Sequence, residues 1–470
     1  MADSRFSAKS LSDKRIRFWH GFGIYFCVMN RKTTIIVLSL AAQLAAPAQQ
    51  RWSLDDCIGY ALKHANEVRR QKVEQRQAGV DYRTAVLNFL PTVSAQANGQ
   101  YSWGRNIDPE TNIYNTVATF NNYYGISASM QIFDGGQTWN AFRLARLAKN
   151  AAPTAVQKAK DDKAIDVMQK FVDAVYTLKS IAIMEKKLAD SRGLLAKTRR
   201  LYELGEKSRP DVAQMESQTA ADDYNLTHQQ NLARTALLAL KSAMNFPTGD
   251  TLRLDTLVST PTPTAPADGT AGVLSVDAKP AVILADNAAE QARVSWKMQR
   301  AALLPQIYLS GGVSTSYYKT LSSGWTGQAF RQQIRNNLGE YVSLTLSVPL
   351  FSPGGWRSIK RAKADYVIAR LNADDTRRKM RDAAEQALAD YEGCLKETEK
   401  MARKAAADSL AYHTSRRKYE EGMLSTFDLQ QSSQALLASR VALLRLQMVL
   451  AVRLRLVNYY INNEPLWTSN

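Results

Sequence analysis

The chain has few of the side chains that carry out chemistry. After residue 48 it holds three histidines, His64, His228 and His413, and none has a His or Cys neighbour at metal-ligand spacing. It contains no Gly-x-Ser-x-Gly nucleophile motif and no Walker phosphate loop. We therefore predict no metal, no cofactor and no enzymatic activity.

Long apolar runs are also missing. After residue 50 no stretch offers ~20 uninterrupted apolar residues, so we expect no transmembrane helix in the mature chain. A membrane role would then require a β-barrel, because only helices and closed barrels satisfy every backbone group in lipid. Hydrophobic residues make up 45% of the sequence and charged residues 22%, which is enough apolar material for a folded core.

The N-terminus carries the features of an exported protein. Arg31 and Lys32 precede an apolar run at 33–46, and Ala46-Pro47-Ala48 is a small-residue cleavage signal. We predict that residues 1–48 are an N-terminal extension and signal peptide, and an apolar run at 18–28 keeps an uncleaved anchor as the alternative. The whole chain has a net charge of +18, and the chain that follows the leader stays strongly basic. Basic proteins often bind nucleic acid, but export argues against such a partner, and we assign the positive charge of the mature chain to the solvated faces of long helices.

Cysteine usage leaves one question open. Cys57 and Cys394 follow the leader and would lie in an oxidising compartment, where a disulfide is possible. Two separate small buried side chains fit the pattern equally well.

The remaining sequence repeats itself at an offset of 214 to 219 residues. Leu90-Pro91 recurs as Leu304-Pro305, and Tyr202-Glu-Leu-Gly205 recurs as Tyr419-Glu-Glu-Gly422. Several unrelated signals with nearly one offset indicate an internal duplication. We predict a first repeat at 49–246, a Pro/Thr-rich linker at 247–272, a second repeat at 273–463 and a tail at 464–470.

Each half contains two segments with strand periodicity. From Thr92 to Trp103 apolar and polar residues alternate without a break, which predicts a strand with one apolar face. The length and the terminal aromatic residues favour a tilted barrel strand over a strand of a soluble sandwich. Further strands are predicted at about 123–133, 306–318 and 341–351, with polar and aromatic loops at 104–122 and 319–340.

A very long helix follows each strand pair. The ranges 137–204 and 356–421 have almost no Pro or Gly, and at ~1.5 Å per residue each helix would be ~100 Å long. Apolar residues recur at spacings of three and four, as at Val167, Phe171 and Ala174, which is typical of a coiled-coil seam. Pro153 is expected to kink or break the first long helix.

Turn signals end both long helices. A Gly at each end fits the left-handed position that follows a helix. Further on, a Ser stands three residues before an Asp, which predicts an N-cap and a favourable charge at the start of a returning helix. Capping alone would explain these residues, which are Gly205, Ser208 and Asp211 in the first half and Gly422, Ser425 and Asp428 in the second.

Four strands per chain are too few to close a barrel, since known barrels need about eight or more. The chain must therefore oligomerise, and this pattern alone does not choose between two copies with eight strands and three copies with twelve.

The ordered set of motifs resembles the TolC family of outer-membrane efflux proteins. The resemblance covers about 51–463, and each motif except the opening segment occurs once in each half. The matching residues are the opening segment Trp52–Ala61 with Asn66, the Leu-Pro pairs, the strand-to-helix corners Phe133–Gly136 and Pro349–Gly355, and the hairpin tips.

This resemblance implies an α+β membrane protein of the cell outer membrane that extends into the periplasm. A homotrimer would contribute four strands per chain to a 12-stranded β-barrel, continuous with a 12-helix coiled-coil α-barrel, with the linker in an equatorial position. The expected partners are outer-membrane lipid, a periplasmic adaptor (membrane fusion protein) and an inner-membrane pump, with no nucleic acid. The expected function is a passive duct for small molecules such as drugs, in a tripartite efflux system.

The resemblance also assigns roles at the hairpin tips. It implies a periplasmic gate at Asp211, Tyr419, Asp428 and Gln431, with Asp428 at an acidic ring position. The sequence departs from the family pattern at Gln431, where a second ring acid is expected, and at Leu424, where an Arg is expected. Adaptor contacts are implied for Gly205, Ser208, Gly422, Leu424 and Ser425.

Two alternatives stay open at this point. A protein-secretion channel working with an ABC exporter would have the same architecture, because the pump selects the cargo. A soluble periplasmic coiled-coil scaffold would explain the long helices but not the four alternating strands.

Overall fold

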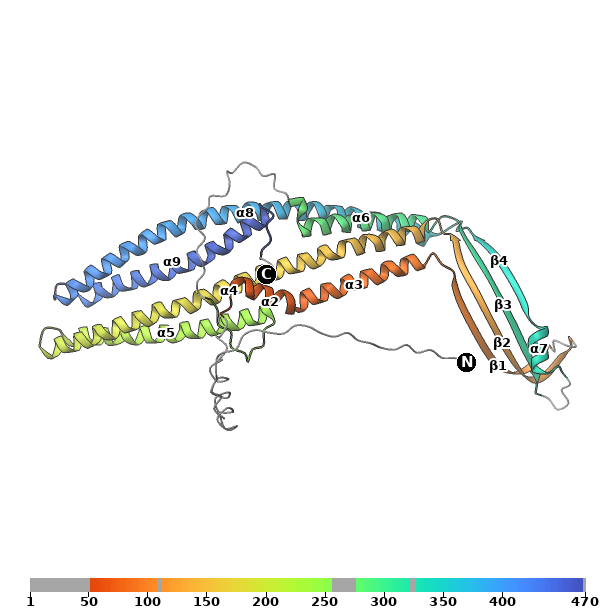
Figure 1. The fold of residues 1–470 in the computed structure, drawn as a ribbon, viewed down its shortest axis with the longest axis horizontal. Helices are drawn as coiled ribbons and strands as arrows, with labels where there is room; N and C mark the ends of the chain where they lie inside the picture. Colours follow the sequence, from red (N-terminus) through yellow and green to blue (C-terminus); the bar gives the residue numbers. More distant parts are fainter. Residues whose placement is uncertain (1–50, 108–111, 256–275, 322–326, 468–470) are drawn as a thin grey trace, which may run out of the picture. The chain divides into compact units, whose positions relative to one another are not determined.

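A computed structural model describes residues 51–107, 112–255, 276–321 and 327–467. The predicted leader at 1–48 and most of the predicted linker at 247–272 lie outside these residues. The described chain is mostly helical and contains one four-stranded sheet (Figure 1). Its elements are α2 (Leu54–His64), α3 (Asn66–Leu87), β1 (Thr92–Ile107), β2 (Tyr114–Phe133), α4 (Gln137–Glu203), α5 (Arg209–Met244), η1 (Val276–Ala278), α6 (Pro280–Ala301), β3 (Gln306–Thr320), α7 (Phe330–Asn336), β4 (Gly339–Ser347), α8 (Pro353–Glu420) and α9 (Thr426–Tyr460).

The sheet has the order β1-β2-β3-β4, and every neighbouring pair is antiparallel. The register aligns Val93, Ala128, Gly311 and Val342 across the four strands, so the apolar positions of each strand share one face. Each strand therefore keeps the predicted period of two, because a register slip of one residue would turn its apolar side chains to the polar face.

The strand ends differ from the prediction. β1 continues to Ile107 and β2 begins at Tyr114, so most of the range predicted as a loop at 104–122 pairs as strand. β4 is shorter than predicted and ends at Ser347. The range 319–340 contains α7, a helix that the polar sequence did not indicate, and it lies against β3.

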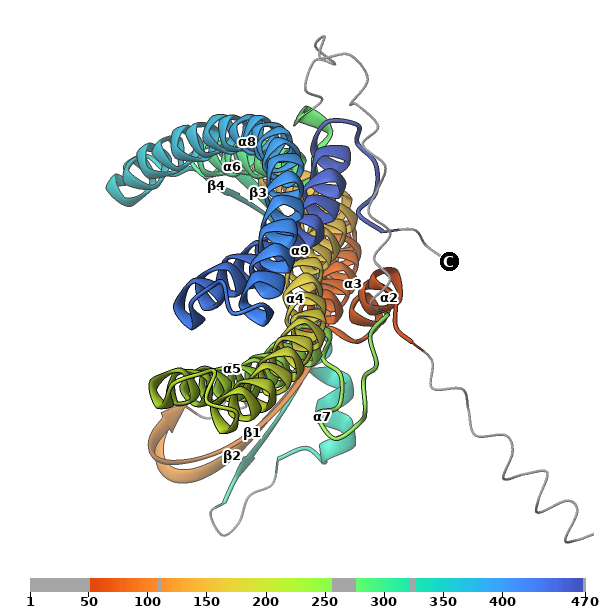
Figure 2. The ribbon, with the colours of Figure 1, turned by 90° about the vertical axis from the view of Figure 1, so that its left-hand side faces the viewer.

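The two long helices form as predicted, with 67 residues in α4 and 68 in α8. α4 is continuous through Pro153, so the helix does not break there, and a kink at this proline stays a prediction. A proline removes one backbone hydrogen bond, while α3 and α6 both pack along α4 and support the helix from outside. α4 returns as α5 and α8 returns as α9, which gives the two hairpins of Figure 2.

The two Gly-Gly corners are not equivalent. Gly135 and Gly136 both have positive φ and precede α4, whereas Gly354 and Gly355 belong to the first turn of α8. The second corner is instead capped by Ser352, whose side chain accepts from the Gly355 N–H.

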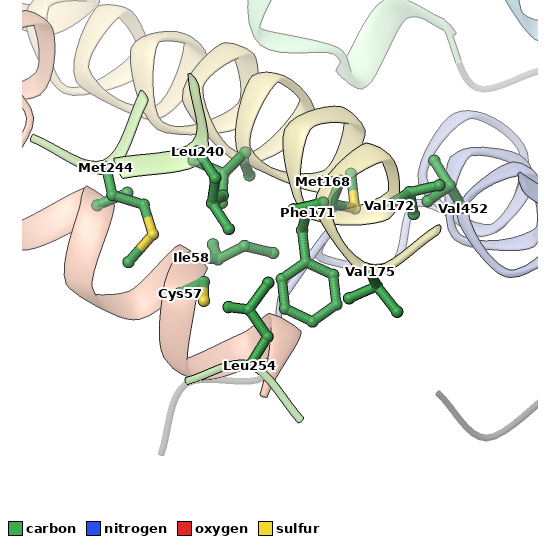
Figure 3. Packing of buried hydrophobic residues seen from close by; sticks show 14 of the residues in the cluster. Cys57, Ile58, Met168, Phe171, Val172, Val175, Leu240, Met244, Leu254 and Val452 are labelled. Atoms are coloured by element: carbon green, nitrogen blue, oxygen red, sulfur yellow. The ribbon is translucent and has the colours of Figure 1, made fainter. Parts of the chain in front are cut away.

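The largest buried cluster joins α2, α4, α5 and α9. In Figure 3, Ile58, Phe171 and Leu240 of this cluster lie together, and Val452 packs beside Val172. Cys57 belongs to this cluster, while Cys394 belongs to another cluster between α8 and α9, and both are free thiols. The structure therefore favours two separate buried cysteines over a disulfide.

By length and hydropathy, α9 is the one helix among the described residues that could cross a membrane. The sequence did not indicate this, because Arg440, Arg445 and Arg453 interrupt its apolar residues. α9 packs along α8 and against α4, and Met448, Leu450 and Val457 are buried in those contacts. The packing of α9 against α8 and α4 therefore accounts for its apolar residues.

Candidate functional site at the hairpin tips

Both hairpin turns use the same backbone hydrogen bonds. Gly205 and Gly422 have φ values of 80° and 77°, in the left-handed region that glycine enters without a steric cost. The N–H of Gly205 donates to the Tyr202 carbonyl at 3.0 Å, and the N–H of Gly422 donates to the Tyr419 carbonyl at 3.1 Å. The following residue donates back to the preceding turn in each case, which completes a Schellman motif. The predicted helix ends are confirmed.

The returning helices begin at the predicted caps. Ser208 Oγ accepts from the N–H of Asp211, and the Asp211 carboxylate accepts from the N–H of Ser208 at 3.1 Å, which forms a complete capping box. Ser425 Oγ accepts from the N–H of Asp428 at 3.1 Å. Ser425 Oγ also donates to the Asp428 carboxylate at 2.6 Å. Local chemistry therefore accounts for both Ser/Asp pairs.

Asp211 has a second role that the sequence did not show. Its other carboxylate oxygen, Oδ1, accepts from Thr426 Oγ1 at 2.9 Å, and Thr426 is the first residue of α9. One side chain thus caps its own helix and holds the tip of the other hairpin. The hydrogen bond from Ser208, with those from the Ser208 backbone and Thr426, holds the pKa of Asp211 below its usual value.

Tyr419 links the hairpins at another point. Its side chain is fully buried, and its hydroxyl lies 2.7 Å from Thr198 Oγ1 on α4, where either group can donate. The Lys207 ammonium lies over the Tyr419 ring at 4.6 Å from the centroid, a cation–π contact. Asp211 and Tyr419 therefore both join the two hairpins, but through separate partners.

Further polar contacts follow the facing sides of α5 and α9. Gln214 Nε2 donates to Gln430 Oε1 at 3.3 Å, and Gln430 Nε2 donates to the Gln214 carbonyl at 3.3 Å. Gln434 approaches Gln218 at 3.5 Å. Apart from the bond of Thr426 to the Asp211 carboxylate, these α5–α9 contacts are thus made of neutral amide groups, each of which could exchange its partner for water at small cost.

A buried ion pair lies farther from the tips. Lys187 Nζ lies 3.4 Å from Asp222 Oδ2, and the two side chains are 13% and 3% exposed. Lys187 also donates to Ser433 Oγ on α9 at 2.7 Å. Asp222 accepts from Gln218 Nε2 at 2.8 Å and from Ser191 Oγ. This cluster, which we call the Lys187–Asp222 cluster, joins α4, α5 and α9.

A groove of about 200 Å³ opens beside this cluster, between α4, α8 and α9. Lys186, Arg416 and Arg440 line it, with Asp190 as the one carboxylate. Arg416 lies 3.8 Å from Asp190 and 3.1 Å from Glu420, so part of its charge is balanced. Among the described residues no group of His, Cys, Asp or Glu could hold a metal ion.

The other predicted site residues make fewer contacts. Leu424 is half-buried and packs against the cluster that contains Tyr419. Asp428 and Gln431 are exposed, and the described residues show no hydrogen bond from either to the first hairpin. Sequence reasoning missed Thr198, Thr426, Lys187 and Asp222, because the partners of these residues lie on other helices and no local spacing marks them.

Comparison with known proteins gives a family and a fold. The sequence model described as "Outer membrane efflux protein" matches residues 57–245 and 278–455. The outer membrane efflux protein BepC of Brucella suis is 24% identical over 362 residues, which are 74% of this chain and 73% of BepC.

Solved structures agree in fold. The outer membrane protein VceC of Vibrio cholerae has a TM-score of 0.73 at 15% identity, over 87% of this chain and 95% of VceC. The MtrE outer membrane channel of Neisseria gonorrhoeae, in its open state, has a TM-score of 0.68 at 19% identity, over 87% of this chain and 88% of MtrE.

Proposed function

Because the chain belongs to the outer membrane efflux protein family, we propose that it is the passive duct of a tripartite efflux system for small molecules such as drugs. The chain is an outer-membrane efflux channel and has no enzymatic activity of its own. The observation that supports the proposed duct best is a sheet with two free edges, built onto two long helical hairpins. A duct of this kind depends on partners for energy, and we propose a periplasmic adaptor and an inner-membrane pump.

The sheet supports assembly from several copies. Among the described residues, β1 and β4 each pair along one edge only. Free strand edges cannot face lipid, because their N–H and C=O groups would lose their hydrogen bonds. Pairing of β4 with β1 of a second copy removes both edges, and a homotrimer would give the 12-stranded barrel that the resemblance implies.

The two faces of the sheet differ in the way a membrane barrel requires. One face carries exposed apolar side chains, including Ile126 at 59%, Val342 at 83% and Leu344 at 67%. The opposite face carries hydroxyl and amide groups, such as the paired Ser94 and Ser127 at 3.1 Å. We infer that the apolar face contacts outer-membrane lipid and that the polar face lines the duct.

The helices offer a matching contact between copies. On α3, Val73, Val80 and Leu87 are each 59% exposed at a spacing of seven residues, which is a coiled-coil seam without a partner. On α8, Ile368 and Leu371 are 54% and 62% exposed. Because α3 and α8 are the outer members of the helix row α3-α4-α6-α8, closure would bring these two surfaces together as part of a 12-helix α-barrel.

The order of elements supports an internal duplication. Each half contains a helix, two strands, a long helix and a returning helix. We propose repeats at 49–246 and 273–463, joined by an equatorial linker at 247–272.

We assign the gate and the adaptor contacts to the tips. Asp211 and Tyr419 would keep the hairpins together in a closed state, since both bond across them. Three-fold symmetry would place three Asp428 carboxylates around one axis, with Gln431 beside them, and like charges held close attract cations. The adaptor would contact Gly205, Ser208, Gly422, Leu424 and Ser425, which lie at or beside the two turns.

A protein-secretion channel with an ABC exporter is the second candidate, since the same duct serves either pump. A soluble periplasmic scaffold is disfavoured, because it gives no reason for an exposed apolar sheet face.

Extraction and reconstitution test the proposal. Protein taken from outer membranes in mild detergent should have the mass of three chains and should conduct ions in planar bilayers. The double variant Asp211→Ala with Tyr419→Phe should raise single-channel conductance, because it removes the hydrogen bonds from Asp211 to Thr426 and from Tyr419 to Thr198. Unchanged conductance would remove the gate assignment and leave the duct intact. Release of a monomer by carbonate, without detergent, would contradict the duct itself.

A further inference from the structure

The helix α7 takes the place of a strand along the outer part of β3. β4 pairs with β3 only from Gln306 to Ser314, and β3 continues to Thr320. Beyond Ser314 the edge of β3 is bonded by side chains of the α7 segment. Gln333, which is 6% exposed, accepts from the Tyr318 N–H and donates to the Tyr318 carbonyl, both at 3.0 Å. Asn337 Nδ2 donates to the Ser316 carbonyl at 2.9 Å.

These contacts explain why α7 lies where it does. Ser316 and Tyr318 direct backbone groups toward the side of the sheet where β4 has ended. Two side-chain amides supply the donors and the acceptor that a longer β4 would have supplied. Because α7 meets the backbone through amide side chains, it can cover a strand edge without being a strand.

An aromatic row crosses the sheet at the same level. The rings of Tyr101 on β1 and Phe120 on β2 lie 4.5 Å apart, and Phe120 lies 6.5 Å from Tyr317 on β3. The row then passes to α7, where Phe330 packs on Tyr317 at 5.0 Å, edge to face. Phe330 is still 48% exposed. At the other end of the row, Tyr101 stacks with Trp103, and these two rings are 55% and 77% exposed.

The lengths of the two free strands leave a gap that α7 could fill. β1 has 16 residues and β4 has 9. In a closed assembly, β4 of one copy could therefore pair with little more than half of β1 of the next copy. The outer part of β1 would keep a free edge at the level of the aromatic row, which is the level of a membrane interface in barrels.

We propose that α7 binds the outer part of β1 of a second copy of this chain, with Phe330 packed against that copy's Tyr101 and Trp103. This inference rests on the proposed assembly of several copies. It adds a contact between neighbouring copies that strand pairing does not supply. It makes the aromatic row continuous from copy to copy, and it covers the strand edge that the short β4 leaves open.

Cysteine pairs test the contact in intact outer membranes. Ala329→Cys, at the start of α7, combined with Tyr101→Cys should give covalently linked chains on treatment with a short bis-maleimide. Ala329→Cys combined with Gln100→Cys is the matched control, because Gln100 lies one residue away on the opposite face of β1. Wild type gives the background, and its Cys57 and Cys394 are fully buried.

A second set of pairs separates this inference from the assembly on which it rests. Val342→Cys on β4, combined in turn with Val93→Cys, Ala95→Cys and Ala97→Cys on β1, should link where the two strands pair. If the β4 pairs link and the Ala329–Tyr101 pair does not, or if the Gln100 control links equally well, the α7 contact is wrong and the assembly stands. If no pair links, the proposed assembly fails together with the contact.

Substitution at Phe330 gives an independent readout. Phe330→Ala should lower the temperature at which the assembly separates into single chains on SDS gels, while Phe330→Trp should keep the wild-type value, because it preserves a ring in the row. Equal values for Phe330→Ala and wild type would overturn the role of this ring.

Discussion

The two hairpin tips share their local chemistry and differ in the contacts between them. Both tips have a left-handed Gly after the first helix and a Ser/Asp cap on the second. Asp211 of the first tip bonds across to Thr426, whereas within the described part of the chain Asp428 of the second tip bonds to its own cap residue, Ser425, and not to the first hairpin. Of the two tyrosines, the one in the second tip, Tyr419, makes the contact with the other hairpin.

Tyr202 of the first tip is 43% exposed, while Tyr419 of the second tip is fully buried against α4. The turn and cap hydrogen bonds are present in both halves. Each of the two cross-hairpin contacts, that of Asp211 and that of Tyr419, is made by a residue of one half and not by its counterpart in the other half. Residues that end and begin a helix act within one hairpin, so they can be alike in both. A contact between the hairpins joins two surfaces that are not equivalent, so a residue that makes such a contact in one half need not have a counterpart that makes it in the other. The features that distinguish the two tips are therefore the ones that could hold or release a gate.

The largest expected effect comes from the Lys187–Asp222 cluster. Asp222→Asn leaves the largely buried Lys187 ammonium without its carboxylate partner. Breaking a buried ion pair of this kind costs about 3 kcal/mol of folding stability. Amide hydrogen exchange of the detergent-solubilised protein should show faster opening of α5 and α9 around residues 218–222 and 430–434. This variant would weaken the contact between the hairpins without changing either turn.

The neighbouring residue supplies the control. Asp223 pairs with Arg192 at 3.1 Å, and both side chains are more than half exposed, so Asp223→Asn should change stability by less than about 1 kcal/mol. The double variant Lys187→Met with Asp222→Leu should recover most of the loss, because no charge is then left unpaired. Equal exchange rates in Asp222→Asn and Asp223→Asn would show that the buried pair does not hold the hairpins together.

A smaller effect is expected from the two tyrosines. Tyr419→Phe removes the hydroxyl that meets Thr198 and keeps the buried ring. Thr198 still donates to the Leu194 carbonyl at 2.9 Å, so the cost should be about 1 kcal/mol. Tyr202→Phe, at the equivalent position of the first tip, should cost less than half of that, because its hydroxyl is at the surface.

Thermal unfolding in detergent measures this difference, with both variants compared in one buffer. If Tyr202→Phe lost more stability than Tyr419→Phe, the conclusion that the tyrosine of the second tip is the one that joins the hairpins would be wrong.

Local features of this molecule were predictable, and contacts between distant segments were not. The caps at Ser208 and Ser425 and the left-handed glycines follow from residues within four positions of one another, so a short stretch of sequence contains the whole signal. The alternation of Thr92–Trp103 is equally local. The contact of Thr198 with Tyr419 joins residues 221 positions apart, and neither residue type marks the other.

Two segments that were predicted as loops, α7 and the outer part of β2, differ from the prediction for the same physical reason. α7 has only 7 residues, too few to be stable as an isolated helix, and its contacts with β3 hold it in place. The outer part of β2, from Tyr114 to Asn122, is polar and aromatic and has the composition of a loop, and it becomes strand because β1 provides a partner along its whole length. In both segments packing against a neighbour overrides the local preference.

The smallest expected effect is the pH dependence of the Asp211 contact. The pKa of Asp211 is lowered in the folded protein, chiefly by the hydrogen bond from Ser208, so its contribution to stability is present above the unfolded pKa of ~3.9 and is lost as pH falls through the lower folded pKa. Asp211→Asn should thus reduce stability by about 0.5–1 kcal/mol at neutral pH, and the difference from wild type should shrink below about pH 4.

Asp428→Asn is the matched control for Asp211→Asn, because it removes a carboxylate at the same helix position with no bond to the other hairpin. At neutral pH the exchange of amides in both tips should rise in Asp211→Asn, since Thr426 then loses its charged acceptor. In Asp428→Asn the rise should be confined to the second tip. If both variants affect both tips equally, the cross-hairpin bond is irrelevant to opening, and the assignment of Asp211 to the gate has to be given up.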